Sequence, residues 1–221
     1  METSTEHPIA FAFLARLGSA ALPRIGSSGD GHLAHVQRAF EPSWVEGLPL
    51  PVGEEKDVEQ TVALINGQDF ERETDTRAAA RAYEKRPRTR VYESLGVRSN
   101  GWFSLAEVQL AGLLRRHVIC TAYESRTGDS NLGAHEDAWL GVIVQMRGAK
   151  RWRLWPDRSR SPDEIVMRAG DVLILPKHVQ HEVETPAAPG HSLHLLFAVT
   201  DQPIATWQDR HRAGNAAQPL S

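Results

Sequence analysis

The strongest constraint on the fold is the second half of the chain, which has the pattern of a series of short β-strands. Segments rich in β-branched and aromatic residues follow one another there, separated by turn residues. Seven short strands at this spacing are typical of a β-sandwich or barrel. Residues 146–149 predict a tight hairpin, and residues 168–171 predict another turn. The expected strands span residues 118–124, 139–146, 149–155, 164–167, 171–175, 180–185 and 192–199.

The first 117 residues show the spacing of helices instead. Val58, Val62 and Ile65 fall on one face of a predicted helix, which Asn66 and Gly67 end. Two more helices are predicted in this half, over residues 74–86 and 104–115, and a capping box at Ser104 and Glu107 begins the second. Loops are predicted over residues 18–31 and at prolines 42, 49 and 51.

This change of pattern predicts three parts. Residues 1–117 form a helix-rich region that packs on the barrel, residues 118–200 form the β-rich core, and residues 201–221 form a short C-terminal appendage. The expected fold class is therefore mainly β, with a helix-rich N-terminal half.

Composition excludes several classes of protein. The chain has 25 basic and 28 acidic residues and a net charge of −3, so we expect no nucleic-acid partner. No apolar stretch reaches ~18 residues, which argues against a membrane protein. Glu2 and Glu6, with no Lys or Arg, precede the apolar stretch near the N-terminus, which is the wrong charge for a secretory signal. With Cys120 as the only cysteine, no intrachain disulfide can form, and we expect a cytoplasmic protein.

Histidines and one carboxylate in the β-rich half predict a metal site. In an extended segment His135 and Asp137 point to the same face, while the residue between them points away. Together with His181 on a later strand, they can occupy one face of an octahedron and leave three positions open, as in non-heme Fe(II) oxygenases. A His-x-Asp pattern alone is common in proteins without metal, and zinc hydrolases use similar ligands. The three residues therefore indicate a metal more firmly than a reaction.

Lys150 is one of only four lysines, and it lies on a strand predicted to face the same barrel. A cation inside a barrel requires an anion, and the carboxylate of a co-substrate would serve. The alternative is a surface lysine on an edge strand.

Three motifs then resemble a known family. They are HED at residues 135–137, QMRGAKRWRL at 145–154, and GDVLILPKHVQHEVETP at 170–186 with HSLH at 191–194. Together they are similar to the JmjC-type, cupin-like Fe(II)/2-oxoglutarate oxygenases, and the third block to the ribosomal-oxygenase branch, which hydroxylates residues of ribosomal proteins. The resemblance covers about residues 118–200. It implies a double-stranded β-helix (cupin or jelly-roll) core, Fe(II) bound by His135, Asp137 and His181, and 2-oxoglutarate held by Lys150.

The sequence also departs from the family pattern. The family often has Asn-x-Tyr fourteen residues before the first ligand, where this chain has Thr121 and Tyr123. Both are predicted to contact the co-substrate. His178 stands where glycine is common. The ribosomal-oxygenase branch carries dimerisation and winged-helix domains after the catalytic one, and we expect this chain to lack them.

The resemblance implies a hydroxylase that couples oxidation to decarboxylation of 2-oxoglutarate. Its expected substrate is a peptide or protein side chain. A small molecule or natural-product intermediate is the alternative substrate, and a metal-binding cupin without catalysis is the alternative function. Residues 125–134, which precede the first ligand, are expected to form a lip for the substrate. The sequence gives no indication of the oligomeric state.

Overall fold

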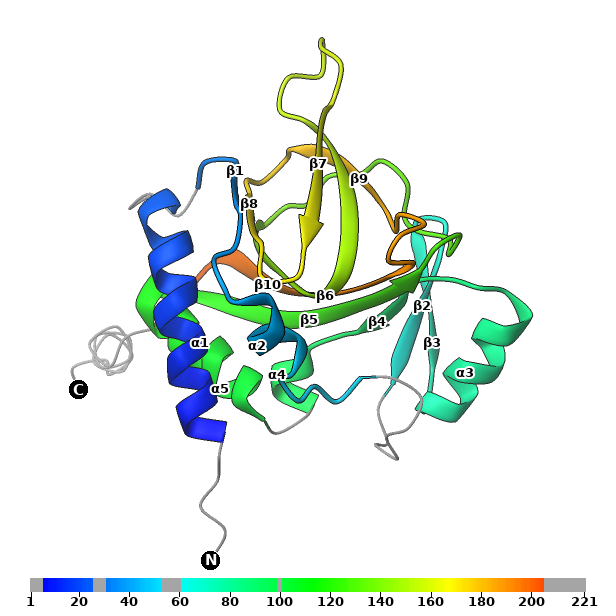
Figure 1. Ribbon diagram of the computed structural model, residues 1–221, viewed down its shortest axis with the longest axis horizontal. Helices are drawn as coiled ribbons and strands as arrows, with labels where there is room; N and C mark the ends of the chain where they lie inside the picture. The colour runs from blue at the N-terminus through cyan, green and yellow to red at the C-terminus, as the bar shows by residue number, and fades with distance from the viewer. Residues whose placement is uncertain (1–5, 26–30, 53–60, 99–100, 205–221) are drawn as a thin grey trace, which may run out of the picture.

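The computed structural model describes residues 6–25, 31–52, 61–98 and 101–204. Its centre is a curled antiparallel sheet in which two long strands, β6 (Leu140–Trp155) and β5 (Arg116–Arg126), flank β10 (His191–Pro203) (Figure 1). On one side β8 (Val172–Leu175) continues from β6, and β1 (Ala34–Val36) continues from β8.

Three strands of the N-terminal half extend the sheet beyond β5. They follow in the order β4 (Arg90–Tyr92), β2 (Val62–Asn66) and β3 (Asp69–Glu73). The predicted helix through Val62 and Ile65 is therefore wrong. Residues 62–65 are all buried, because both faces of β2 are covered, and such a run fits a strand as well as a helix. Val58 lies outside the described residues.

The second half of β6 belongs to a second layer. There β6 pairs with β7 (Asp163–Arg168) and with β9 (Gln180–Glu184), while its first half pairs with β8 and β10. The layers meet at Gly148, which has φ +66°, and a Cβ there would overlap the carbonyl oxygen of His191. The hairpin predicted over residues 146–149 is wrong, because the glycine bends one continuous strand instead of reversing it. The turn predicted at 168–171 is confirmed by the hydrogen bond from Asp171 N to Arg168 O, 2.9 Å.

A helical layer covers the outer face of β5 and β10. Its members are α1 (Glu6–Ala21), α2 (Pro42–Glu46), α4 (Leu95–Arg98) and α5 (Trp102–Leu114) (Figure 1). Phe13 of α1 is central: its ring centroid lies 4.7 Å from that of Trp102 and 6.0 Å from that of Phe197 on β10. This aromatic contact ties the helices to the middle of the sheet.

Helix ends differ from their predicted positions. The loop predicted from residue 18 is wrong up to residue 24, because α1 runs to Ala21 and a 3-10 turn follows. Pro42 begins α2, where its missing N–H costs nothing, instead of marking a loop. The capping box at Ser104 is also wrong, since Gly101 precedes the first turn of α5 without a side-chain cap. The helix predicted over 74–86 is confirmed as α3 (Thr76–Lys85), which Asp75 caps through Ala78 N.

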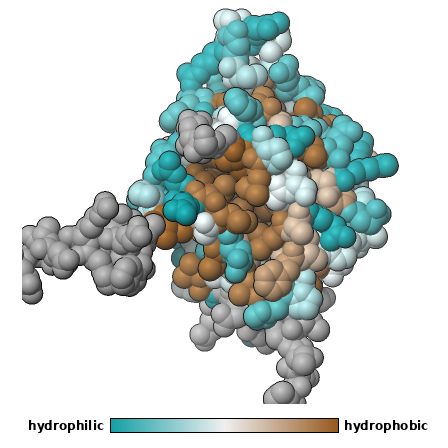
Figure 2. Space-filling view, turned by 90° about the vertical axis from the view of Figure 1, so that its left-hand side faces the viewer, coloured by the Kyte–Doolittle hydropathy of each residue, from teal (hydrophilic) through white to brown (hydrophobic). Residues whose placement is uncertain are grey.

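Part of the helical layer has an apolar outer face. Figure 2 shows apolar side chains gathered on the left-hand side of the molecule in Figure 1, where α1 lies. Phe11 of α1 is 60% exposed. Within the described ranges, no helix is both long enough and apolar enough to span a bilayer.

Candidate functional site

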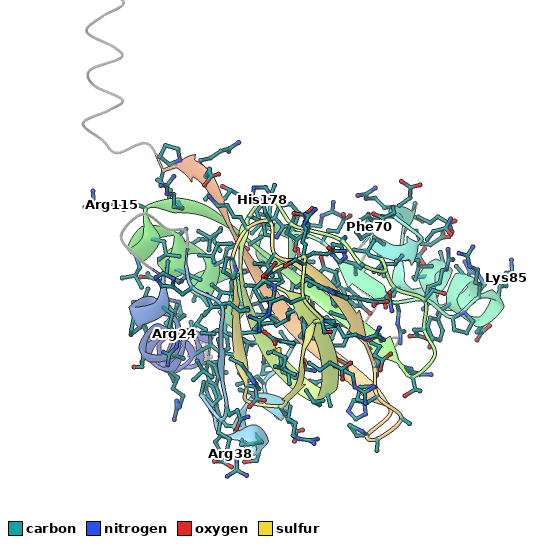
Figure 3. The ribbon with its side chains drawn as sticks, turned by 90° about the horizontal axis from the view of Figure 1, so that it is seen from above. Arg24, Arg38, Phe70, Lys85, Arg115 and His178 are labelled. Atoms are coloured by element: carbon teal, nitrogen blue, oxygen red, sulfur yellow. The ribbon has the colours of Figure 1, made fainter. Side chains whose placement is uncertain are left out.

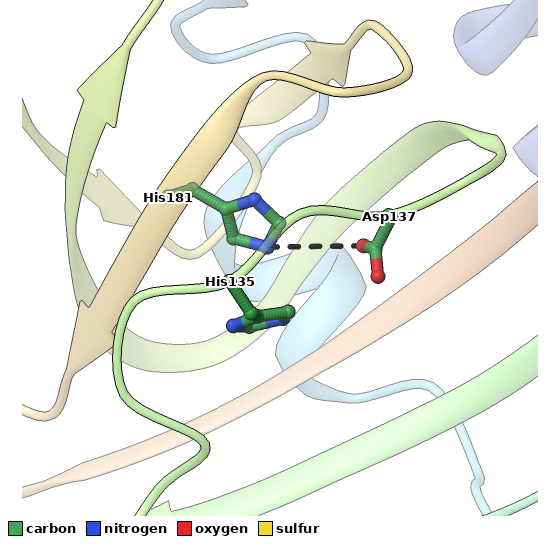
Figure 4. A group of neighbouring side chains, drawn as sticks. All are labelled: His135, Asp137 and His181. Atoms are coloured by element: carbon green, nitrogen blue, oxygen red, sulfur yellow. Dashed lines mark ion pairs between the residues drawn. The ribbon is translucent and has the colours of Figure 1, made fainter. Parts of the chain in front are cut away.

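The barrel brings His135, Asp137 and His181 together. His135 and Asp137 lie on the segment that leads into β6, and His181 lies on β9. Each residue offers a ligand atom within 4.8 Å of the other two. His181 Nε2 lies 3.7 Å from Asp137 Oδ2, and the two imidazole centroids are 4.2 Å apart (Figure 4). The geometry expected of a three-residue metal site is thus present, and the role of these residues as ligands stays a prediction.

Backbone hydrogen bonds hold the three residues in register. His135 N donates to His181 O at 2.9 Å, and His181 N donates to His135 O at 2.8 Å. Such a reciprocal pair places both imidazoles on the same face. His178 N donates to the backbone carbonyl of Asp137 at 2.9 Å, so the turn before β9 also fixes the backbone at Asp137.

Each histidine is locked in the tautomer that a metal needs. His135 Nδ1 lies 2.9 Å from Gly133 O, and His181 Nδ1 lies 3.0 Å from Val179 O. Because a carbonyl oxygen only accepts, each Nδ1 must carry the proton. In a neutral imidazole held in this way, the lone pair resides on Nε2, the atom available to a metal. Burial lowers the pKa of His181, which favours this neutral form.

An internal cavity of about 250 Å³ adjoins the three residues. Its walls are mostly apolar or aromatic, with a few polar groups, as in a small-molecule site. Lys150, Tyr123 and His194 also line it. Further residues of the cavity wall include Ile65, Gln68, Phe70, Asn131, Leu132, Trp139 and Trp152.

Lys150 is 2% exposed, as the predicted interior position requires. Its Nζ donates to Ser125 Oγ at 2.7 Å and to Thr185 Oγ1 at 3.2 Å. Burial lowers the pKa of Lys150 to about 8, against the opposing charges of Asp129 and Glu184. Among the residues that the structure describes, no carboxylate lies within 4.0 Å of Nζ. A buried cation without a contacting anion favours an anionic ligand.

Tyr123 and His194 form a flat wall next to Lys150. Their rings stack with centroids 5.1 Å apart and an interplanar angle of 7°. Burial and the charge of Lys150 lower the pKa of His194 to about 3, so this imidazole is neutral. Thr121 lies two residues along β5 and is not among the residues that line the cavity. Contact of Tyr123 or Thr121 with a co-substrate stays a prediction.

The N-terminal half supplies part of the cavity wall. Ile65 and Phe70 come from β2 and β3, and Leu132 comes from the segment after β5. Gln68 Nε2 donates to Leu132 O at 2.9 Å, which links the two sides. In Figure 3 Phe70 lies between the barrel and the helix that carries Lys85. The predicted lip over residues 125–134 contributes Asn131 and Leu132 to this wall.

Sequence reasoning missed several of these residues. Ser125 and Thr185 carry no spacing signal, because their partner Lys150 is remote from both in the chain. The sequence alone does not distinguish Trp139 and Trp152 from ordinary core residues. Ile65 was placed on the wrong type of element, which concealed its position at the cavity.

Comparison with known proteins agrees with the resemblance predicted from the sequence. No family model matches the sequence. Ribosomal oxygenase 2 of Rattus norvegicus is 32% identical over 96 residues, which cover 37% of this chain and 21% of that protein. Ribosomal oxygenase 2 of Bos taurus is 27% identical over 107 residues, covering 42% and 23%. The chain is similar to the ribosomal oxygenases. It spans less than a quarter of the length of these curated relatives.

Comparison with solved structures shows a similar fold over most of the chain. The ribosomal oxygenase YcfD from Escherichia coli superposes with a TM-score of 0.54 at 14% identity, covering 87% of this chain and 55% of that one. A structure of YcfD in complex with cobalt and 2-oxoglutarate gives a TM-score of 0.54 at 12% identity, covering 87% and 56%. The predicted resemblance and the double-stranded β-helix fold are confirmed.

Proposed function

We propose that this chain is an Fe(II)- and 2-oxoglutarate-dependent hydroxylase that acts on a peptide or protein side chain. The observation that carries the proposal is the convergence of the His135, Asp137 and His181 donor atoms on a cavity that Lys150 also lines. The three donor residues suit a divalent cation, and Lys150 suits an anion.

The donor set fits iron. Two neutral imidazoles and one carboxylate are the ligands that Fe(II) takes in oxygenases, and three coordination positions would remain for other ligands. His135, Asp137 and His181 would hold the metal, and Lys150 would pair with the distal carboxylate of 2-oxoglutarate. When both are bound, they supply the oxidising chemistry that hydroxylates a C–H bond, with succinate and CO2 as co-products. The apolar walls exclude water from that chemistry.

A protein substrate is supported by the names of the relatives. A small molecule or natural-product intermediate would use the same chemistry, and the wall that Ile65, Phe70 and Leu132 contribute to the cavity is apolar enough for either. A metal-binding cupin without catalysis has no need of a buried, unneutralised lysine, so Lys150 favours an enzyme. A cytoplasmic location, with no nucleic-acid or membrane partner, belongs to the same proposal.

Metal and co-substrate binding test the proposal directly. The wild-type protein is titrated anaerobically with Fe(II) and 2-oxoglutarate, and the charge-transfer absorbance and succinate formation are measured. Asp137→Ala should lower Fe(II) affinity more than about a hundredfold and abolish succinate formation, because it removes a ligand. His191→Ala is the matched control, since this histidine is exposed on β10 and lies outside the cavity. Full iron content and turnover in Asp137→Ala would refute the assignment.

A further inference from the structure

Part of the cavity wall is built from apolar side chains that β2, β3 and the segment after β5 supply. Ile65 of β2 is buried, and Phe70 and Leu132 pack against the small apolar cluster to which it belongs. Tyr123 packs against this cluster and also against the apolar cluster inside the barrel. The apolar wall formed by Ile65, Phe70 and Leu132 therefore continues into the barrel interior.

Few ionisable side chains line the cavity. Among the described residues they are, apart from the three candidate ligands, Glu136, Lys150, Tyr123 and His194. Burial raises the pKa of the Tyr123 phenol and lowers the pKa of His194 to about 3, so both side chains are neutral. Glu136 forms an ion pair with Arg158. In the described part of the wall, the candidate ligands aside, no carboxylate is therefore left unpaired to bind a basic side chain.

The charges that the proposed bound state brings together already balance. The positive charges of Fe(II) and Lys150 equal the negative charges of Asp137 and the two carboxylates of 2-oxoglutarate. A substrate side chain with a charge of its own would enter this cavity without a partner. Removing a charge from water without pairing it is costly, so an uncharged side chain is favoured.

We propose that the residue hydroxylated by this chain has an apolar side chain, which Ile65, Phe70 and Leu132 select by direct contact. The apolar wall removes the surface of such a side chain from water. It offers no partner to the charge of a lysine, arginine, aspartate or glutamate, and this is what excludes them. The inference rests on the proposed function, because it names the class of substrate for the same site.

A random peptide library tests this without a known substrate sequence. The library lacks methionine, cysteine and tryptophan, which oxidise without an enzyme. It is incubated with the Fe(II)-loaded protein, 2-oxoglutarate and oxygen, and tandem mass spectrometry locates each added oxygen, with the Asp137→Ala protein as background. Leucine, isoleucine, valine and phenylalanine should be hydroxylated at least about a hundredfold more often than lysine, arginine, aspartate and glutamate, since burial of an unpaired charge costs that much binding.

Leu132→Glu tests whether the apolar wall makes the choice. Leu132 is half-buried in the segment after β5, and a carboxylate there gives a basic side chain a partner. Hydroxylation of lysine and arginine relative to leucine should rise about tenfold or more. Leu132→Gln is the matched control, because it has the same shape as glutamate without the charge, and it should leave that ratio close to the wild-type value. Leu113→Glu places the same charge on the exposed side of α5, outside the cavity, and should change nothing.

Three outcomes would overturn the inference. One is hydroxylation of charged residues as often as leucine by the wild type. Another is the absence of any hydroxylated peptide when the wild type binds Fe(II) and 2-oxoglutarate and forms succinate. The third is equal selectivity of Leu132→Glu and Leu132→Gln, and the wild-type library decides the question even where a Leu132 variant does not fold. A wild type without Fe(II)-dependent 2-oxoglutarate binding would instead refute the proposed function, and this inference with it.

Discussion

Burial of the charged Lys150 side chain opposes stability, whereas the proposed binding of an anion requires that charge. The buried ammonium group has a pKa of about 8, below its ordinary value of 10.5, because burial disfavours the charged form. Below pH 8 the lysine is charged in both the folded and the unfolded chain, so the full cost of burial, on the order of 3 kcal/mol, is present at neutral pH. A cost of this size supports the proposed role of Lys150 in binding an anion.

We therefore expect Lys150→Met to stabilise the protein. The substitution removes the buried charge and keeps the volume, and the hydroxyls of Ser125 and Thr185 can still bond to each other at 2.7 Å. The free energy of unfolding in urea at pH 7 should rise by about 1–3 kcal/mol. Affinity for 2-oxoglutarate should fall in the same variant. A less stable Lys150→Met protein would contradict this account.

The pH dependence of stability should follow from the same group. Between pH 8 and about 10.5 the unfolded chain keeps the lysine proton that the folded chain has lost, so stability due to Lys150 rises with pH. The advantage of Lys150→Met over the wild type should therefore shrink as the pH rises from 8 to 10. Urea unfolding of both proteins at each pH measures this difference, in which the other titrating groups cancel. A constant difference would place the pKa of Lys150 at its ordinary value.

At the scale of elements, β6 is the strand that joins the two layers of the barrel. Its first half belongs to the large sheet and its second half to the layer with β7 and β9, so one strand connects the helix-covered sheet to the strand that carries His181. The bend at Gly148 allows β6 to pass from one layer to the other, and Lys150 lies two residues after that bend. The position of the cationic group thus depends on a local backbone conformation that only glycine adopts easily.

Gly148→Ala should be strongly destabilising. The added Cβ would overlap the carbonyl oxygen of His191 at a positive φ, so the bend and the pairing with β10 must shift, with an expected loss of more than about 2 kcal/mol. Gly112→Ala in α5 is the control, because its Cβ meets nothing within 4 Å and alanine favours a helix by about 0.5–1 kcal/mol. Urea unfolding of both variants measures the contrast, and equal stabilities would contradict it.

Sequence patterns predicted the elements of the second half better than those of the first. The helix α3 and most strands after residue 116 were predicted within a few residues. Prediction failed at β2, where burial on both faces removes the alternation that marks a strand. It failed at Gly148 because a bend and a reversal both require a glycine with positive φ, and only the partner strands distinguish them.

The candidate site was predicted only in part for a similar reason. The three candidate ligands and Lys150 are residue types that are rare in a barrel interior, so their type and spacing, together with the family resemblance, were enough to predict them as neighbours of one cavity. Ser125 and Thr185 are ordinary strand residues, and only the folded chain shows that they share one ammonium group. The lining residues Ile65, Gln68 and Phe70 come from the half of the chain that had no motif.

At the scale of the whole molecule, the sheet passes through the predicted boundary at residue 117. Strands β1 to β4 come from before that point, and β4 pairs with β5 along Arg90–Tyr92. The helical layer shares one core with the barrel, since Phe13, Trp102 and Phe197 are in contact. Division of the chain into separate parts remains a prediction.

A fragment of residues 118–200 should not fold alone. Without α1 and α5, the outer face of β10 with Phe197 is uncovered, and β5 presents a bare edge where β4 was paired. We expect no cooperative thermal transition and no near-ultraviolet circular dichroism in the fragment, in contrast to the full chain under the same conditions. A cooperative transition would establish the boundary as a true domain border.

The position of β10 has a consequence for synthesis. It lies between β5 and β6 and is the last strand of the described chain to be made, so those two strands have no shared neighbour until it leaves the ribosome. Every earlier intermediate carries two open edges in the middle of its future sheet. We therefore expect the growing polypeptide to depend most on chaperones just before β10 emerges.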